Sequence, residues 1–162
     1  MRLSNRNKAP VYNFINTVLI MILIFGIIGF FLEKYKFHIL GWESSLLIVV
    51  PALFLLLFHL AGRQIFEYDS DGEALNFKNR NILQFIKKSV NDEFPKYKLL
   101  KYEVVRFFII KRLYITISSK KNNSNILKYD ISFLSNMEVN DLKFSLNKVV
   151  KANKEKDNNS RI

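Results

Sequence analysis

Apolar and polar residues are separated into long blocks along this chain. Residues 14–32 (FINTVLIMILIFGIIGFFL) carry no charge, and Asn16 and Thr17 are the only polar side chains among them. Residues 44–62 (SSLLIVVPALFLLLFHLAG) also lack a formal charge when His59 is neutral. A helix needs about 20 apolar residues to cross the hydrocarbon core of a bilayer, and neither run has the polar face of a soluble core helix. The pattern therefore predicts two membrane-spanning helices.

The first run is expected to remain as an anchor. It is longer than the roughly 7–15 apolar residues of a signal peptide, and no small-residue cleavage pattern follows it. The loop 33–43 is short, so the two helices are expected to be antiparallel neighbours. Gly26 and Gly29 allow close approach of the helices, although their spacing is not GxxxG. Pro51 removes one backbone hydrogen bond from the second helix.

Lysine and arginine are distributed unevenly around the two runs. Residues 1–13 contain Arg2, Arg6 and Lys8 and no acid, whereas the loop 33–43 has no net charge. From Arg63 onward there are 20 Lys and Arg against 12 Asp and Glu. The positive-inside rule therefore predicts a two-span protein of the cell membrane with both termini in the cytoplasm.

Beyond residue 62 the pattern changes to short β-type segments, which indicates a cytoplasmic α+β domain over residues 63–153. Polar residues 91–93 are interpreted as a break, Lys111-Arg112 as a turn or bulge, and residues 120–125 as a loop. Residues 82–88 fit a strand or a helical turn, and a strand is favoured. About seven strands are expected, at residues 63–68, 73–78, 82–88, 97–102, 104–110, 113–118 and 126–133.

A single amphipathic helix is expected to close the domain. Ser135 or Asn136 is a suitable N-cap, and Leu142, Leu146 and Val149 recur at helical spacing. Residues 154–162 are polar and are expected to form a disordered tail.

Three alternating carboxylates in FEYDSDGEALNF (residues 66–77) raise the question of a calcium site. An EF-hand-type loop needs a bidentate Glu six residues after its Gly, but Lys78 stands six residues after Gly72. Asp71-Gly72 between two β-type segments is instead typical of a hairpin turn. We therefore expect Asp69, Asp71 and Glu73 to be solvated residues beside a turn.

The sequence contains no motif for catalysis. It has no cysteine and only two histidines, His38 and His59, both of which flank the apolar runs. Nucleotide-binding glycine loops, metalloprotease motifs and nucleophile elbows are absent. We therefore expect a protein that is not an enzyme and that has no metal or other cofactor.

The segments FEYDSDGEALNF, KRLYITISSKK, ILKYDISFLS and MEVNDLKFSLNKVV together resemble the pleckstrin-homology-like (PH-like) fold. The whole chain is similar to small bacterial membrane proteins in which two transmembrane helices precede a PH-like, YcxB-like domain. The resemblance implies two orthogonal sheets closed by a carboxy-terminal helix. It implies an architecture more than an activity, and no catalytic residue is carried over from it.

The net charge of +11 points to anionic lipid as a partner. Each Lys or Arg near an anionic leaflet contributes about 1 kcal/mol, although the same residues also serve solubility and topology. Nucleic acid is not expected, because the rings of VVRFFIIKRLY are interpreted as core. The candidate lipid contacts lie at the membrane exit or in predicted loops: Arg63, Lys87, Lys88, Lys111, Arg112, Lys120 and Lys121.

These features predict an integral membrane protein whose cytoplasmic PH-like module binds a protein segment or lipid headgroups without catalysis. A peptide would bind naturally along an exposed strand edge. The alternative is an accessory or structural subunit of a larger membrane complex. The sequence leaves open whether a protein partner or a second copy of the chain is bound.

Overall fold

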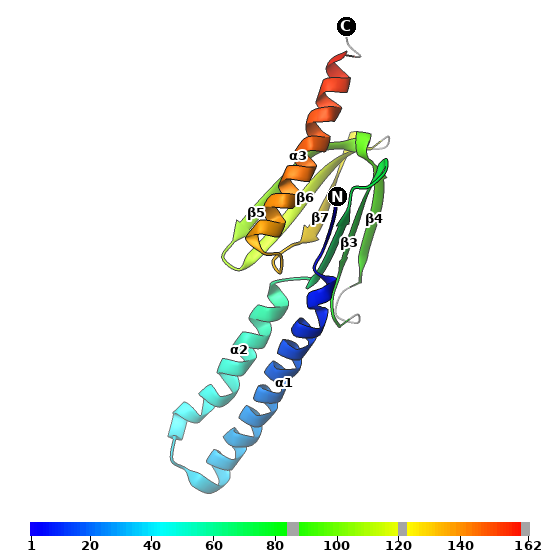
Figure 1. The fold of residues 1–162 in the computed structure, drawn as a ribbon. Coiled ribbons are helices and arrows are strands. Elements are labelled where there is room, and N and C mark those ends of the chain that lie inside the picture. Colours follow the sequence, from blue (N-terminus) through cyan, green and yellow to red (C-terminus); the bar gives the residue numbers. More distant parts are fainter. Residues whose placement is uncertain (84–87, 120–122, 160–162) are drawn as a thin grey trace. The chain divides into compact units, whose positions relative to one another are not determined.

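The computed structural model describes residues 1–83, 88–119 and 123–159 of the chain (Figure 1). These residues form two compact units. One unit is Pro10–Leu60, and the other combines Met1–Ala9 with Ala61–Ile162. The second unit is therefore assembled from two segments of chain that flank the first.

The unit Pro10–Leu60 is a helical hairpin. Helix α1 (Ala9–Leu32) continues as a π-helical turn over Glu33–Phe37, and a 3-10 turn over Gly41–Ser45 leads into α2 (Leu46–Leu60). The stretches Arg6–Phe37 and Gly41–Leu60 are long and apolar enough to cross a membrane, by length and composition. Only 6% and 11% of their most apolar windows are buried, whereas the core helix of a soluble protein is mostly buried. Residues 33–37 and 41–43 of the predicted loop are helical as well.

The two helices of the hairpin approach each other closely at Gly26. A Cβ atom built on Gly26 would lie 2.0 Å from the backbone oxygen of Leu47, which is far inside van der Waals contact. A Cβ atom on Gly29 would meet only the Leu47 side chain, at 3.6 Å. The close approach expected from the sequence is therefore confirmed for Gly26, where the absent side chain lets the backbones meet.

Gly26→Ala is expected to destabilise the hairpin by about 1–3 kcal/mol, because the added methyl group forces the two helices apart. Gly29→Ala is the matched control and is expected to have little effect. Thermal unfolding of both variants in detergent micelles, followed by circular dichroism, measures the difference. Equal melting temperatures for the two variants would show that Gly26 does not set the helix contact.

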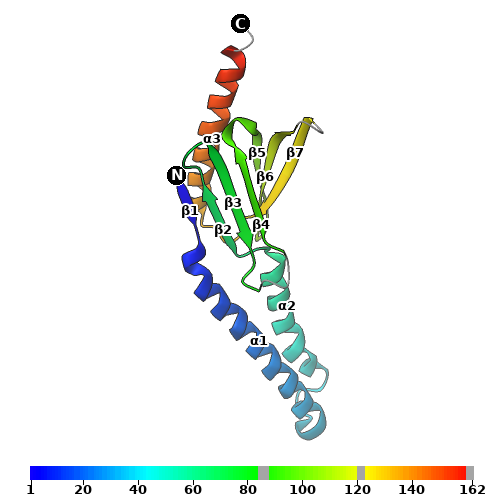
Figure 2. The same cartoon turned by 90° about the vertical axis from the view of Figure 1, so that its right-hand side faces the viewer.

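The second unit contains two antiparallel sheets and a helix (Figures 1 and 2). The first sheet has the strand order β1–β2–β3–β4 and the second has the order β5–β6–β7. The first sheet consists of β1 (Arg2–Ser4), β2 (Ile65–Asp69), β3 (Ala74–Arg80) and β4 (Val90–Pro95). After a 3-10 turn at Lys96–Lys98, the second consists of β5 (Leu99–Phe107), β6 (Ile110–Ser119) and β7 (Asn123–Asp130). Helix α3 (Asn136–Asn159) ends the described chain.

The core lies between the sheets and is rich in aromatic rings. Phe77 of β3 stacks on Tyr129 of β7 at 4.8 Å and on Phe94 of β4 at 5.7 Å between ring centroids. The Tyr129 hydroxyl donates a hydrogen bond of 2.7 Å to Asp92. Burial, together with this carboxylate, raises the pKa of the Tyr129 phenol well above its usual value. Tyr129 therefore stays neutral and joins β7 to β4 across the two sheets.

Helix α3 contacts both sheets. Its residues Val139, Leu142 and Leu146 are fully buried and recur at helical spacing. The Tyr68 hydroxyl of β2 lies 3.0 Å from the Ser145 hydroxyl, and the Tyr102 hydroxyl of β5 donates to the Lys143 carbonyl at 3.2 Å. The helix thus covers the core beside β2 and β5.

Of the two predicted N-caps, Ser135 and Asn136, it is Ser135 that caps α3, and it does so in a capping box. The Ser135 hydroxyl accepts a hydrogen bond from Glu138 N at 3.2 Å, and the Glu138 carboxylate accepts one from Ser135 N at 2.7 Å. Partial burial raises the pKa of Glu138, but the hydrogen bonds from Ser135 and from Lys8 Nζ lower it by more. Glu138 is therefore charged near neutral pH and fixes both the helix start and the segment before α1.

The amino-terminal segment forms a strand that the sequence analysis did not predict. Arg2, Leu3 and Ser4 pair with Asp69, Tyr68 and Glu67 of β2 in an antiparallel register. Leu3 is buried, and Asn5 is completely buried. The predicted segment 1–13 is therefore not separate from the domain: its first residues complete the first sheet, and α1 already begins at Ala9.

Three assignments predicted within residues 63–133 are wrong. The strands predicted at residues 97–102 and 104–110 are one strand, β5, which ends at Phe107. The polar residues 91–93 are part of strand β4, which lies at the sheet edge with Asn91 and Glu93 exposed and Phe94 buried. Lys111 and Arg112 are not a turn but belong to β6, and the chain turns instead at Phe108 and Ile109. At residues 91–93 and at Lys111-Arg112, polar and charged residues were interpreted as breaks in the strands. An exposed strand position tolerates such residues as well as a turn does.

Helix α3 extends to Asn159 and so includes residues 154–159, for which the sequence predicts a disordered tail. The described residues contain seven strands, but one of them is β1 and six lie within residues 65–130. The strand proposed over residues 82–88 falls mostly on residues 84–87, which lie outside the described residues. Residues 120–122 of the predicted loop 120–125 also lie outside the described residues, and residues 123–125 of that loop belong to β7 instead.

Replacing residues 10–60 by a short Gly/Ser linker is expected to leave a folded, water-soluble domain, because all seven strands and α3 remain. The same variant without residues 1–5 is expected to lose about 3 kcal/mol or more, since the packing of Leu3 and the hydrogen bonds of Asn5 disappear. Urea denaturation followed by circular dichroism measures the difference. Equal stability of the two variants would contradict the role assigned to β1.

Candidate functional site

The carboxylates of the β2–β3 hairpin form ion pairs with the amino-terminal strand. Arg2 Nε lies 2.9 Å from Asp69 and 3.2 Å from Asp71. The hairpin predicted from Asp71-Gly72 is confirmed, because β2 and β3 pair in register on either side of it. Among the described residues, no three His, Asp or Glu side chains are placed to hold a metal ion. These acids therefore serve the pairing of β1 with β2.

Asp130, at the end of β7, forms ion pairs with two of the predicted lipid-contact residues. Its carboxylate lies 3.3 Å from Arg63 Nη1 and 3.6 Å from Arg112 Nε, and it accepts a hydrogen bond from Arg63 N at 3.2 Å. Gly62 packs against this carboxylate so closely that a Cβ atom there would lie 2.5 Å from Asp130 Cγ. Gly62 and Arg63, just after α2 in the chain, are therefore held to the domain by a buried, charged contact with Asp130.

A buried amide continues this network between the sheets. Asn79 Nδ2 donates to the carbonyl oxygens of Ile65 at 3.1 Å and of Asp130 at 2.9 Å, and Asn79 Oδ1 accepts from Asp130 N at 3.0 Å. Asn79 is completely buried. It fixes the end of β7, and with it the position of the Asp130 carboxylate.

The other predicted lipid contacts have separate roles. The Lys88 carbonyl accepts two hydrogen bonds of 3.3 Å from the Arg63 guanidinium. Lys111 Nζ donates to the Leu134 carbonyl at 3.0 Å and to Asn136 Oδ1 at 3.3 Å, just before and at the start of α3. Four of the seven predicted residues, Arg63, Lys88, Lys111 and Arg112, thus lie at one end of the domain. Lys87, Lys120 and Lys121 lie outside the described residues.

Asp130→Asn is expected to destabilise the domain by about 3–5 kcal/mol, because it leaves the partly buried guanidinium groups of Arg63 and Arg112 without a counter-charge. Glu103→Gln is the control, since it removes the exposed Lys101–Glu103 pair at 3.8 Å and should cost at most about 0.5 kcal/mol. Urea denaturation of both variants measures the difference. Similar losses would show that the Asp130 contacts are not structural.

The β5–β6 turn at this same end exposes a cluster of apolar side chains. Phe107, Phe108 and Ile109 are 77%, 92% and 41% exposed. Phe107 pairs with Ile110, so Phe108 and Ile109 are the two central residues of a tight turn. Phe108 has a φ of 52°, at the position where glycine is usual in a type II′ turn. A non-glycine residue in this region of φ costs about 1–2 kcal/mol.

Sequence reasoning placed these rings in the core and so missed the exposed turn. The segment VVRFFII has high β propensity and no Gly, Asn or Asp, so nothing in it indicates a turn. The one nearby signal, the cationic pair Lys111-Arg112, placed the turn three residues too late in the chain.

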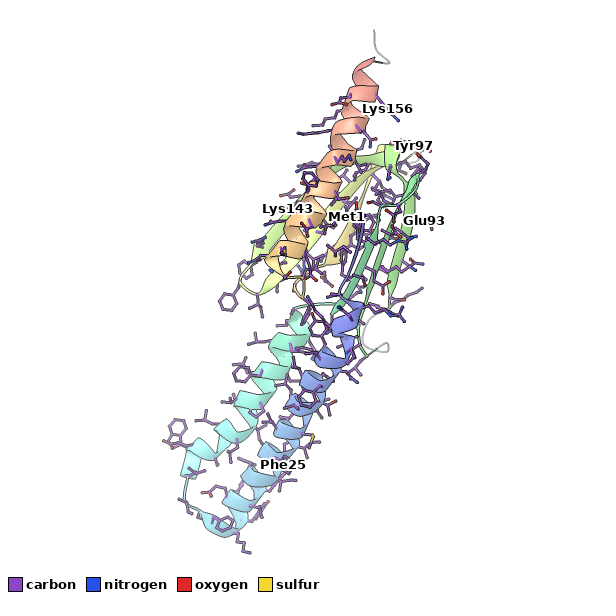
Figure 3. The ribbon with its side chains drawn as sticks, viewed as in Figure 1. Met1, Phe25, Glu93, Tyr97, Lys143 and Lys156 are labelled. Atoms are coloured by element: carbon purple, nitrogen blue, oxygen red, sulfur yellow. The ribbon has the colours of Figure 1, made fainter. Side chains whose placement is uncertain are left out.

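A groove of about 510 Å³ lies at the other end of the domain. We define the α3 groove by one face of α3, the 3-10 turn Lys96–Lys98 and the β2–β3 turn. Phe144, Lys148, Ala152 and Lys156 lie on its α3 wall at intervals of four residues, which places them on one helix face. Tyr97 faces the groove from the 3-10 turn, and Figure 3 shows Tyr97 and Lys156 at the same end of the domain.

Hydrogen bonds hold the walls of the α3 groove together. Asn153 Nδ2 donates to the carbonyl oxygens of Lys96 at 2.7 Å and of Leu99 at 2.9 Å, which fixes the 3-10 turn against α3. Lys96 N donates to the Glu73 carbonyl at 2.9 Å, and Lys96 Nζ donates to the Gly72 carbonyl. The groove is therefore preformed, and ligand binding would require little ordering of the protein.

The lining of the α3 groove is amphipathic and mainly cationic. Tyr97 and Phe144 are 69% and 76% exposed, so both rings can receive a ligand. Lys96, Lys148 and Lys156 supply three positive charges, and Glu73 is the one acid in the lining. Such a surface suits a ligand that combines apolar groups with negative charge.

No protein-family model matches the chain, and no curated protein or solved structure matches it either.

Proposed function

We propose that this protein is a two-span membrane protein whose PH-like cytoplasmic domain is a non-enzymatic module that binds an acidic segment of a partner protein. The four-stranded sheet, the three-stranded sheet and the closing helix follow the order that the PH-like resemblance implies. In this proposal the hairpin of α1 and α2 is inserted between the first and second strands of that fold.

The arrangement of the chain supports the proposed topology. Two crossings return the chain to the side on which it started, and the segments before α1 and after α2 belong to one unit. The same segments hold most of the Lys and Arg, which favours the cytoplasmic side. The proposal thus has the domain at the inner surface of the cell membrane, with residues 38–40 in the loop outside.

The α3 groove carries the proposed binding function. Its walls are fixed by Asn153 and Lys96, its volume of about 510 Å³ lies within the usual range for ligand sites, and its charge favours an anion. An acidic helix with a leucine or phenylalanine stripe would place apolar groups against Phe144 and Tyr97. Its carboxylates would then meet Lys148 and Lys156.

A fluorescein-labelled helical peptide with a leucine face flanked by glutamates is a suitable probe. We expect saturable binding to the full chain in phosphatidylcholine nanodiscs, measured by fluorescence anisotropy. The double variant Lys148→Glu, Lys156→Glu should weaken binding by about 30-fold, because two favourable charge contacts of about 1 kcal/mol each are lost.

Two controls separate binding in the groove from general attraction by a basic protein. Lys78→Glu with Lys128→Glu changes the net charge equally at exposed strand positions outside the groove and should leave the affinity nearly unchanged. A peptide with glutamine in place of glutamate should bind weakly. If the two double variants bind the acidic peptide equally, the proposed function is wrong.

A further inference from the structure

The exposed β5–β6 turn lies at the end of the domain where the chain enters from α2. Arg112 of β6 and Arg63 both contact Asp130, and Leu60, the last residue of α2, precedes Arg63 by three residues. The three residues from Leu60 to Arg63 span at most about 10 Å. The turn lies two or three strand residues, roughly 7–10 Å, beyond Arg112. The aromatic turn therefore lies close to Arg63, where the chain that follows α2 enters the domain.

The chemistry of this turn is that of a membrane-interface contact. Phe107, Phe108 and Ile109 form the apolar tip, and Arg106, Lys111 and Arg112 follow behind it on both strands. Aromatic rings favour the headgroup layer of a bilayer, and cations beside them are attracted to anionic lipid. No acidic residue occurs between Val104 and Leu113; Asp130 pairs with Arg112 from the neighbouring strand, so Arg106 is the cation that this contact leaves for lipid.

The conformation of Phe108 is an independent reason to assign a role to its side chain. Glycine or asparagine would adopt its positive φ with less strain. The ring gains no packing within the domain, because it is 92% exposed. A bulky side chain that strains its own turn and contacts almost nothing in the folded domain is favoured only if something outside the domain covers it.

We propose that the tip formed by Phe107, Phe108 and Ile109 inserts into the interface of the bilayer that α1 and α2 cross, with the exposed Arg106 on anionic headgroups. The insertion gives the domain a second attachment besides the chain itself and so fixes its tilt. This inference rests on the membrane-spanning part of the proposed function and is independent of the α3 groove.

Single-tryptophan variants of the full chain test the insertion. Trp42 is the only tryptophan, so Trp42→Phe provides the background for Phe108→Trp. Phe144→Trp is the matched control, because Phe144 is similarly exposed but lies in the α3 groove. Phe25→Trp in α1 reports whether the hairpin is in the bilayer (Figure 3). The probe is a nanodisc of phosphatidylglycerol and phosphatidylcholine, prepared with and without bromine on the acyl chains.

We expect brominated lipid to quench Phe108→Trp and Phe25→Trp and to leave Phe144→Trp unchanged. The emission of Phe108→Trp should also be shifted to the blue, and adding Arg106→Glu should reduce its quenching. Quenching of Phe25→Trp alone would overturn the insertion while leaving the spans in place. Absence of quenching at both positions would overturn the spans and the insertion together. A blue shift without quenching would mean that a protein surface covers the tip, which also contradicts the proposal.

Discussion

The pairing of β1 with β2 is the contact on which the rest of the structure depends. It joins residues that the hairpin separates by about sixty positions in the chain, and it is secured at its end by Asn5. Asn5 Nδ2 donates to the Gln64 carbonyl at 2.8 Å, and Asn5 Oδ1 accepts from Phe66 N at 2.8 Å. Asn5 is completely buried, so its amide cannot replace these hydrogen bonds with hydrogen bonds to water unless the sheet opens. The two helices are therefore an insertion between neighbouring strands and not an appendage before the domain.

Polar contacts and apolar packing have different tasks in the folded unit. The rings around Phe77 fill the space between the sheets, whereas Asn79 and Asp130 fix how the two sheets meet near the point of chain entry. Buried hydrogen-bonded groups add little net stability but leave few alternative arrangements of the strands. That restriction is needed here, because the long loop between β1 and β2 opposes their pairing.

Sequence patterns predicted the elements that are governed by local chemistry. The apolar blocks identified both helices of the hairpin, Asp71-Gly72 identified the β2–β3 turn, and Ser135 or Asn136 identified the start of α3. The strand β1 was missed because three residues with one buried leucine contain no periodic signal, and its partner is far away in the chain. Phe108 was missed because its residue type argues against the turn that it forms. The α3 groove combines side chains from three distant segments, so no local pattern could have revealed it.

The two proposed binding surfaces are separated by the length of one strand. Strand β5 begins at Leu99, beside the α3 groove, and ends at Phe107 in the exposed tip; its nine residues correspond to roughly 30 Å. Charges interact over about 8–10 Å at physiological salt. With the tip in the bilayer, the lysines of the groove would lie beyond the reach of anionic lipid and would stay available to another ligand. An acidic partner in the α3 groove would also be too far from the headgroups to be repelled by them. The domain would then bind the membrane and the acidic partner at the same time.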